Sequence, residues 1–278
     1  MPLAIPPTAQ PATGFRRLPW LLCVLVVLLQ LGCWFAGVAG GPAKVPLAAL
    51  EMLLLAGLLW NGWRIRCWVK QASGTSRRPQ QVADLTWLAL LVCLFGDAVN
   101  RNVPERFYRY DDVIQHSYLA DSVWFFLPGY TLLIAAIWLA TAGSVRPLWR
   151  FLSLILAAAG GGFAFSQVLL PGTADYITWL TGAYAVIIAL LLPCAAWIWL
   201  AFGTQGLWVA IGAALATVAD TMIGQFWLYG SGYYPAIAYA NFIVYFVSQA
   251  LVQQLPLLAL SNRRPPFQNS YSSTARSV

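Results

Sequence analysis

Two aspartates lie inside apolar stretches of the sequence, where a charged side chain is costly. Asp97 stands in the run LFGDAVNRN and Asp220 in the run ATVADTMIGQF. An ionisable side chain within a membrane span faces the bundle interior in most proteins and is by default a candidate functional group. Two such carboxyls can serve as general acid and general base in one reaction. Asp97 and Asp220 are therefore the first candidates for chemistry.

Further polar residues are expected near these two carboxyls. Glu51 lies in the second apolar span, while Asp121 and Asn241 open the fourth and the eighth. All three fall toward the same side of the membrane as the aspartates, so one polar cluster is expected there. The predicted ligand-binding residues are Glu51, Asp97, Asn100, Asp121, Asp220, Asn241 and Gln249.

Ordinary structural roles are the alternative for several of these side chains. Arg101 stands one turn after Asp97, which would allow a simple ion pair at the membrane edge. Asp121 could cap the N-terminus of its helix. Asp220 has no basic residue within one turn. The side chains that could donate a hydrogen bond to it are Gln225, Tyr229, Tyr245 and Gln249.

Cysteine and histidine usage argues against other kinds of site. The five cysteines stand singly, without a CxxC pair, and are interpreted as small apolar packing residues. His116 is the only histidine and lies in a polar loop, which argues against zinc, bis-histidine haem and a Ser-His-Asp triad. No metal and no cofactor is expected.

The composition indicates an integral membrane protein. The 278 residues are 60% hydrophobic and 9% charged, with a mean hydropathy of +0.69, whereas a soluble domain is about a quarter charged. Apolar stretches of roughly 20 residues recur, which is the length of a membrane-spanning helix. We expect an all-α polytopic fold of about eight spans, at Leu18–Ala39, Val45–Trp63, Leu85–Val99, Tyr118–Ala140, Trp149–Leu170, Ile177–Phe202, Leu207–Tyr229 and Ala236–Leu260.

The basic residues predict the orientation of these spans. Twelve of the sixteen Lys and Arg residues fall on the side that holds both termini, so both termini are expected in the cytoplasm. The net charge of +7 then reflects topology and anionic lipid rather than nucleic-acid binding. The style of the N-terminus suggests a bacterial inner membrane. The alternative for the first span is a cleaved signal peptide, with GVAGG as the cleavage site.

The two aspartate helices belong to an internal repeat. Each is followed by a polar, aromatic loop and then by Ala-Asp or Ala-Asn at the start of the next span. A parallel four-plus-four duplication fits this pattern. The expected organisation is a flexible tail at 1–17, four-helix repeats at 18–140 and 141–260, and a second flexible tail at 261–278.

The paired stretches also carry a family resemblance. GDAVNRN with YLADSVWFFLPGYTLLIAAIWLA, and ADTMIGQFWLYGSGYY with ANFIVYFVSQALV, resemble the polytopic sensor modules that precede GGDEF domains in bacterial membrane-bound diguanylate cyclases. The sequence lacks the cyclase domain. The resemblance therefore implies a membrane module that binds a signal and acts through a partner.

Other motifs resemble the YhhN-type lysoplasmalogenase family, eight-span enzymes that hydrolyse the vinyl-ether bond of lysoplasmalogens. KVPLAALEMLLL is similar to that family's Lys-Pro-Leu helix, LFGDAV and GAALATVAD to its two Asp helices, and YFVSQALV to its closing helix. This resemblance implies a site with Lys44, Asp97, Asp220 and Gln249. Val45 separates Lys44 from the proline, and the histidine expected after the first Asp helix is replaced near Leu127.

The sequence leaves three functions open. The leading interpretation is a sensory or regulatory membrane module that binds a small or lipidic ligand within the helix bundle. The alternative is a lysoplasmalogenase-type lipid hydrolase, in which one of Asp97 and Asp220 donates a proton and the other orients water. A second alternative is a transporter or an accessory subunit. Membrane lipids are the expected partners, with residues 100–117 as a contact for another membrane protein.

Overall fold

The chain folds into a bundle of α-helices. The computed structural model describes residues 14–37, 44–101, 117–169, 172–228 and 235–261, and these residues contain no β-strand. The helices are α1 (Gly14–Phe35), α2 (Lys44–Ser73), α3 (Arg77–Arg101), α4 (Ser117–Ala140), α5 (Pro147–Val168), α6 (Asp175–Ala189), α7 (Leu191–Phe202), α8 (Leu207–Leu228), α9 (Pro235–Val252) and α10 (Leu255–Ser261). The expected all-α membrane fold is confirmed.

Seven helical stretches of the described residues are long and apolar enough to cross a membrane. The sixth, Asp175–Gly224, is 50 residues long and would extend about 75 Å as a straight helix, far more than the roughly 30 Å of a bilayer core. Gly203 ends α7 in the left-handed conformation at φ 58°, and the 3₁₀ turn Gly203–Gly206 reverses the chain into α8. This stretch therefore supplies two crossings, which gives eight in all.

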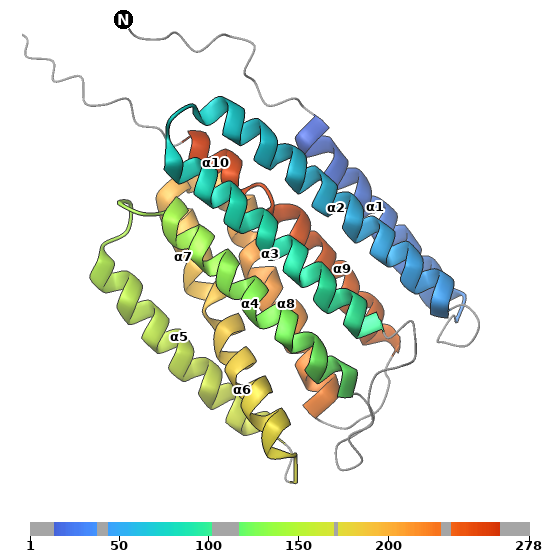
Figure 1. Cartoon of the computed structure of the whole chain (residues 1–278). Coiled ribbons are helices and arrows are strands. Elements are labelled where there is room, and N and C mark those ends of the chain that lie inside the picture. Colours follow the sequence, from blue (N-terminus) through green and yellow to red (C-terminus); the bar gives the residue numbers. More distant parts are fainter. Residues whose placement is uncertain (1–13, 38–43, 102–116, 170–171, 229–234, 262–278) are drawn as a thin grey trace, which may run out of the picture.

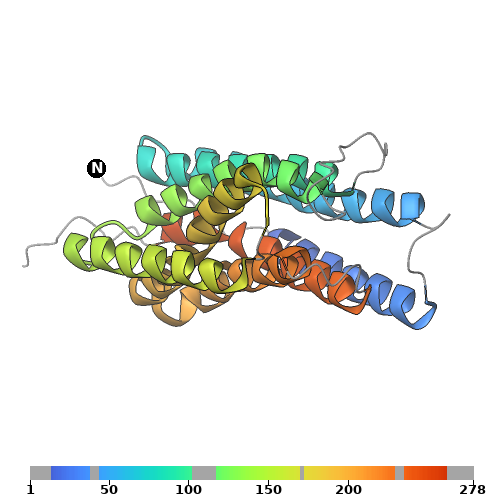
Figure 2. The same cartoon turned by 90° about the horizontal axis from the view of Figure 1, so that it is seen from below.

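The helices run alternately up and down, so α1 begins and α10 ends at the same end of the bundle (Figure 1). We call this the terminal end, and the opposite one the far end. In Figure 2, α2, α3 and α4 form one layer, while α1, α9 and α8 form a second layer against it. Beyond α4 and α8 lie α6 and α7, and α5 is outermost on that side (Figure 1). Both aspartate helices thus have a neighbour on each side, α2 and α4 beside α3, and α7 and α9 beside α8.

Helices α2 and α3 extend farther toward the terminal end than the sequence predicted. The predicted spans Val45–Trp63 and Leu85–Val99 were too short, because α2 continues to Ser73 and α3 begins at Arg77. The extra turns are polar and stabilise each other across the two helices: Asp84 Oδ1 lies 2.5 Å from Arg66 Nε and 2.8 Å from Lys70 Nζ. Hydropathy alone misses such helix ends.

Two predicted spans are interrupted by proline. The span predicted at Ile177–Phe202 is divided into α6 and α7 at Leu190, and the last span is divided into α9 and α10 after Val252. Proline clashes with the carbonyl group four residues before it and lacks an N–H donor. The residues four before Pro193 and Pro256 are Ala189 and Val252, the last residues of α6 and α9.

Helix α5 approaches α6 most closely at one glycine. Its outward residues are apolar and exposed, Leu156 at 72% and Phe163 at 68%. A Cβ atom added to Gly161 would lie 2.7 Å from Ala189 Cβ and 2.9 Å from Ala185 O of α6. The GGG motif thus brings two helix backbones together at its middle glycine, while Gly160 and Gly162 have nothing within 4 Å of such an atom.

Several predictions fall on residues outside the described part of the chain. These include most of both predicted tails, His116, Tyr229, and residues 102–116 of the predicted partner contact. Helix α1 begins at Gly14, inside the predicted first tail. The division into two repeats at 18–140 and 141–260 stays a prediction, as do the cytoplasmic placement of the termini and the bacterial inner membrane.

Replacing Gly161 by alanine should destabilise the protein by about 1–3 kcal/mol, because the added methyl group overpacks the contact between α5 and α6. Gly162→Ala is the matched control, since its methyl group meets no neighbour. Thermal unfolding of both variants in detergent tests this expectation. Equal unfolding temperatures for the two variants would contradict the close approach at Gly161.

Candidate functional site

Asp97 and Asp220 come together in the interior of the bundle, in its far-end half. Asp97 lies four residues before the end of α3 and is 4% exposed, and Asp220 lies eight residues before the end of α8 and is 6% exposed. The two carboxyl groups are close enough to interact electrostatically. Two carboxyls from separate helices therefore share one buried region.

Asp97 is held by a tyrosine of α9. The hydroxyl group of Tyr245 donates a hydrogen bond of 2.7 Å to Asp97 Oδ2, and both side chains are buried. Gly96, beside Asp97, faces Phe126 of α4, whose ring atoms would lie 3.1 Å from an added Cβ. A glycine at this position lets α4 approach α3 next to the carboxyl group.

Asp220 has a different environment. The hydroxyl groups of Tyr130 and Tyr184 lie near its carboxyl group. Neither hydroxyl group makes a hydrogen bond within 3.5 Å, and the same holds for Asp220 Oδ2. None of the ion pairs among the described residues involves Asp220. The Asp220 carboxyl thus has two tyrosine hydroxyl groups as polar neighbours, and neither forms a hydrogen bond within 3.5 Å of its Oδ2.

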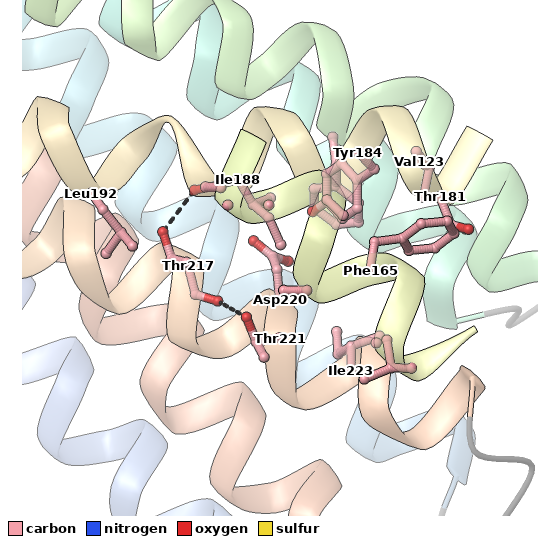
Figure 3. Close-up of a pocket in the computed structure, with 18 of the residues that line it drawn as sticks. Val123, Phe165, Thr181, Tyr184, Ile188, Leu192, Thr217, Asp220, Thr221 and Ile223 are labelled. Carbon is pink, nitrogen blue, oxygen red and sulfur yellow. Dashed lines mark hydrogen bonds between the residues drawn. The ribbon is translucent and has the colours of Figure 1, made fainter. Parts of the chain in front are cut away.

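A cavity of about 380 Å³ opens next to Asp220. Its walls come mainly from α4, α5, α6 and α8, and Figure 3 shows Asp220 projecting from α8 toward Tyr184 and Ile188 of α6. The residues that line it include Asn100, Ser122, Val123, Phe126, Ala157, Gly160, Ala164, Phe165, Thr181, Ala185, Ala189, Leu192, Thr217, Thr221, Ile223 and Gly224. Most of these side chains are small or apolar.

The threonines of this wall contribute little polarity. Thr217 donates to Ile188 O at 2.8 Å, Thr221 to Thr217 O at 2.7 Å and Thr181 to Ile177 O at 2.7 Å (Figure 3 shows the first two). Since each hydroxyl group is already bonded to a backbone carbonyl, these side chains do not need a polar ligand. Among the residues that the structure describes, Asp220 is the only acidic one that lines the cavity.

The cavity lies where two helices fail to pack. Helix α5 packs against α6 and α7, and α8 packs against α6, α7 and α9. Helices α5 and α8 do not pack closely against each other, and both line the cavity. Because α5 is the outermost helix on this side of the bundle (Figure 1), a cavity with α5 in its wall lies close to the surroundings of the bundle. In a bilayer those surroundings are lipid chains.

Glu51 forms a polar cluster with residues of α1 and α3, and its carboxyl lies within electrostatic range of Asp97. Its two carboxyl oxygens accept a hydrogen bond of 2.6 Å from Gln30 Nε2 and an ion pair of 2.7 Å from Arg101 Nη1. The Arg101 guanidinium also lies 4.5 Å from the centre of the Phe242 ring. The structural alternative that paired Arg101 with Asp97 is therefore wrong, because Arg101 reaches α2 instead.

The remaining predicted residues are divided between the cavity and the helix contacts. Asn100 lines the large cavity, whereas Asp121 does not, and each has a buried side-chain oxygen without a hydrogen bond. Asn241 donates to Ala219 O of α8 and so joins two helices. Gln249 lies beside Asp97, and its Nε2 has no partner. The Lys44 side chain lies outside the described residues.

Sequence reasoning missed Tyr130 and Tyr184. Tyr130 is 1% exposed, and its ring lies 6.1 Å from that of Tyr184, with Phe126 6.4 Å from both. The sequence did contain a signal for them. Tyrosines in membrane proteins usually lie at the lipid–water interfaces, so a tyrosine in the middle of a span is unusual. These two tyrosines stand in the middle of apolar runs, LPGYTLL and TGAYAVI, where such a side chain calls for a buried partner.

Truncating Glu51 to alanine should destabilise the protein by about 3 kcal/mol, because it breaks a buried ion pair. This value is at the low end of the range for such pairs, since the Arg101 side chain is 24% exposed. Arg101→Ala and the double variant complete a thermodynamic cycle in thermal or denaturant unfolding. A loss in the double variant that is clearly smaller than the sum of the single losses is expected. Additive losses would show that the two side chains do not interact.

The comparisons with known proteins point to one family. A family model described as the YhhN family matches residues 43–254, which includes both aspartates, Gln249 and every helix of the cavity. No curated protein and no solved structure matches the chain. The resemblance to sensor modules of diguanylate cyclases has no counterpart in these findings, and it stays a prediction. Because the match covers about three quarters of the sequence, the chain belongs to the YhhN family.

Proposed function

We propose that this protein is an intramembrane hydrolase of the lysoplasmalogenase type, which cleaves the vinyl-ether bond of lysolipids. The observation that carries the proposal is the position of Asp220, a buried carboxyl that takes part in no ion pair of the described residues and lies in the wall of an apolar cavity. A second buried carboxyl, Asp97, lies within electrostatic range. The family membership and the resemblance described above support the same activity.

The cavity suits a lipid that carries one aliphatic chain. Its volume of about 380 Å³ falls near the lower end of the roughly 300–1,000 Å³ of small-molecule sites. Ala157, Ala189 and Leu192 line its apolar part, and Asn100 lies one turn after Asp97 at the far end. A chain that enters between α5 and α8 can occupy the apolar part, with the glycerol group toward Asn100 and the ether bond near Asp220.

Asp220 is assigned the role of the acid. Vinyl-ether hydrolysis begins when a proton is added to the double-bond carbon that does not carry the ether oxygen. The other double-bond carbon and the oxygen then form an oxocarbenium ion. A carboxyl buried without a cation costs less free energy in its neutral form, and no ion pair of the described residues includes Asp220. Asp220 can therefore hold the proton that the substrate takes up.

Asp97 is assigned the role of the base. It accepts a hydrogen bond of 2.7 Å from the Tyr245 hydroxyl group, which is the acceptor role of a carboxylate oxygen. The carboxylate orients a water molecule that adds to the oxocarbenium carbon and gives up a proton. Asp97 takes this proton and passes it to the glycerol oxygen as the carbon–oxygen bond of the hemiacetal breaks. The hemiacetal hydroxyl group returns a proton to Asp220, and the products are a fatty aldehyde and a glycerophosphoryl headgroup.

Asp97→Asn and Asp220→Asn should each abolish aldehyde release from lysoplasmalogen by the detergent-purified protein, because each change removes a proton-transferring group. General acid–base groups contribute about 10²–10⁴-fold to rate. The matched control is Asp84→Asn, which changes a carboxylate that is ion-paired near the terminal end and should retain turnover. Unchanged turnover in either membrane-aspartate variant, with the protein folded, would refute the mechanism.

Filling the cavity provides an independent test of the lipid site. Gly160→Leu adds a side chain at a position that lines the cavity and meets nothing within 4 Å, so it should raise KM for long-chain lysoplasmalogen while the fold is kept. Gly162→Leu also meets nothing but does not line the cavity, and it should behave as the wild type. Equal KM values in the two variants would exclude this cavity as the substrate site.

A further inference from the structure

A stripe of polar side chains runs along the buried face of α9 and ends one residue after it. Asn241, Tyr245, Gln249 and Gln253 recur every four residues, which places them on one face of a helix. Their exposed fractions are 8%, 6%, 4% and 1%. Burying apolar side chains on this face would cost less free energy than burying polar ones. The polar side chains therefore need partners that offset this cost.

Gln249 is the member of the stripe with an unmet requirement. Its Nε2 amide group is buried and has no hydrogen-bond acceptor, which costs about 1–3 kcal/mol if nothing else is bound. Buried water is the usual way in which proteins satisfy such groups. The same amide lies one turn from Tyr245, whose hydroxyl is bonded to Asp97.

A small void lies at this point. It has a volume of about 10 Å³, and its polar lining is Asp97, Tyr245 and Gln249, while the remaining walls are five leucines of α2 and α3. This volume is at the threshold of about 10–15 Å³ that one water molecule needs, and three polar partners fall within the usual two to four. None of these three residues lines the large cavity beside Asp220.

The stripe continues from this void toward the terminal end. Gln253 lies about 12 Å along the helix axis from Tyr245, and its Oε1 accepts a 3.0 Å hydrogen bond from Asn61 Nδ2. Asn61 Nδ2 also donates to the carbonyl of Phe15 near the start of α1, and Asn61 Oδ1 has no partner. Buried polar groups thus extend from Asp97 to the end of the bundle where α1 begins.

We propose that the void beside Asp97 is a binding site for one water molecule, which Gln249 and Tyr245 position, and that the polar stripe of α9 connects this site to the terminal end. The inference rests on the proposed hydrolase function, which consumes one water for each ether bond. Lipid then reaches Asp220 from between α5 and α8, and water reaches Asp97 from the opposite side. Gln249 is a positioning residue in this scheme.

Hydroxyl-radical labelling by X-rays, read out by mass spectrometry on the full chain in detergent, tests the water site directly. Bound water generates radicals in place, so Tyr245 should be modified, whereas the neighbouring Phe246, 0% exposed, should not. Gln249→Met keeps the side-chain shape and removes the amide, and it should abolish modification of Tyr245. Ser248→Ala is the matched control, because Ser248 bonds Gly212 O of α8, and it should keep the modification.

The outcomes separate this inference from the proposed function. Unmodified Tyr245 in the wild type, or equal modification in Gln249→Met, overturns the water site even if the protein releases aldehyde. Modified Tyr245 that is lost in Gln249→Met supports the site even if no lysoplasmalogen is cleaved. In a protein that does cleave it, Gln249→Met should lower kcat with little change in KM, since lipid binds on the other side of the acids.

Discussion

The hydrocarbon core of a bilayer offers no hydrogen-bond partner, and this constraint determines where the polar side chains of the protein lie. Glu51 is enclosed by Gln30 and Arg101. Arg150, 3% exposed, donates to Trp138 O and to Thr141 Oγ1. Each of these groups finds its partners on a neighbouring helix, and such contacts fix how the helices pack.

Against this background the surroundings of the two aspartates are unusual. Several polar atoms there are buried and yet unbonded, among them Asp220 Oδ2, the hydroxyl groups of Tyr130 and Tyr184, and Gln249 Nε2. A protein that was optimised for stability alone would satisfy or remove such groups. Groups left open beside a cavity are what binding and proton transfer require, which is why the function is assigned to this region and not to the Glu51 cluster.

The sequence predicted the helical class, the crossings and the two central acids, because hydropathy and a charge inside an apolar run are local signals. It could not predict which helix Arg101 would reach, because this depends on the packing of distant segments. The same limit explains the tyrosines. Tyr130 and Tyr184 are far apart in sequence, and only the approach of α4 to α6 makes them neighbours of Asp220.

Helix α5 forms one wall of the large cavity but holds neither aspartate. Its contacts with the bundle include Arg150, which bonds the end of α4, and Gly161, which meets α6. Its residues can therefore change in size without disturbing the hydrogen bonds of the acids. Helix α5 therefore helps to select the ligand, while α3 and α8 supply the reacting aspartates, so the two properties can evolve separately. Members of a lineage with this architecture can diverge in the chain they accept while the reacting groups stay constant, and substitutions that alter ligand range are expected to accumulate first on α5.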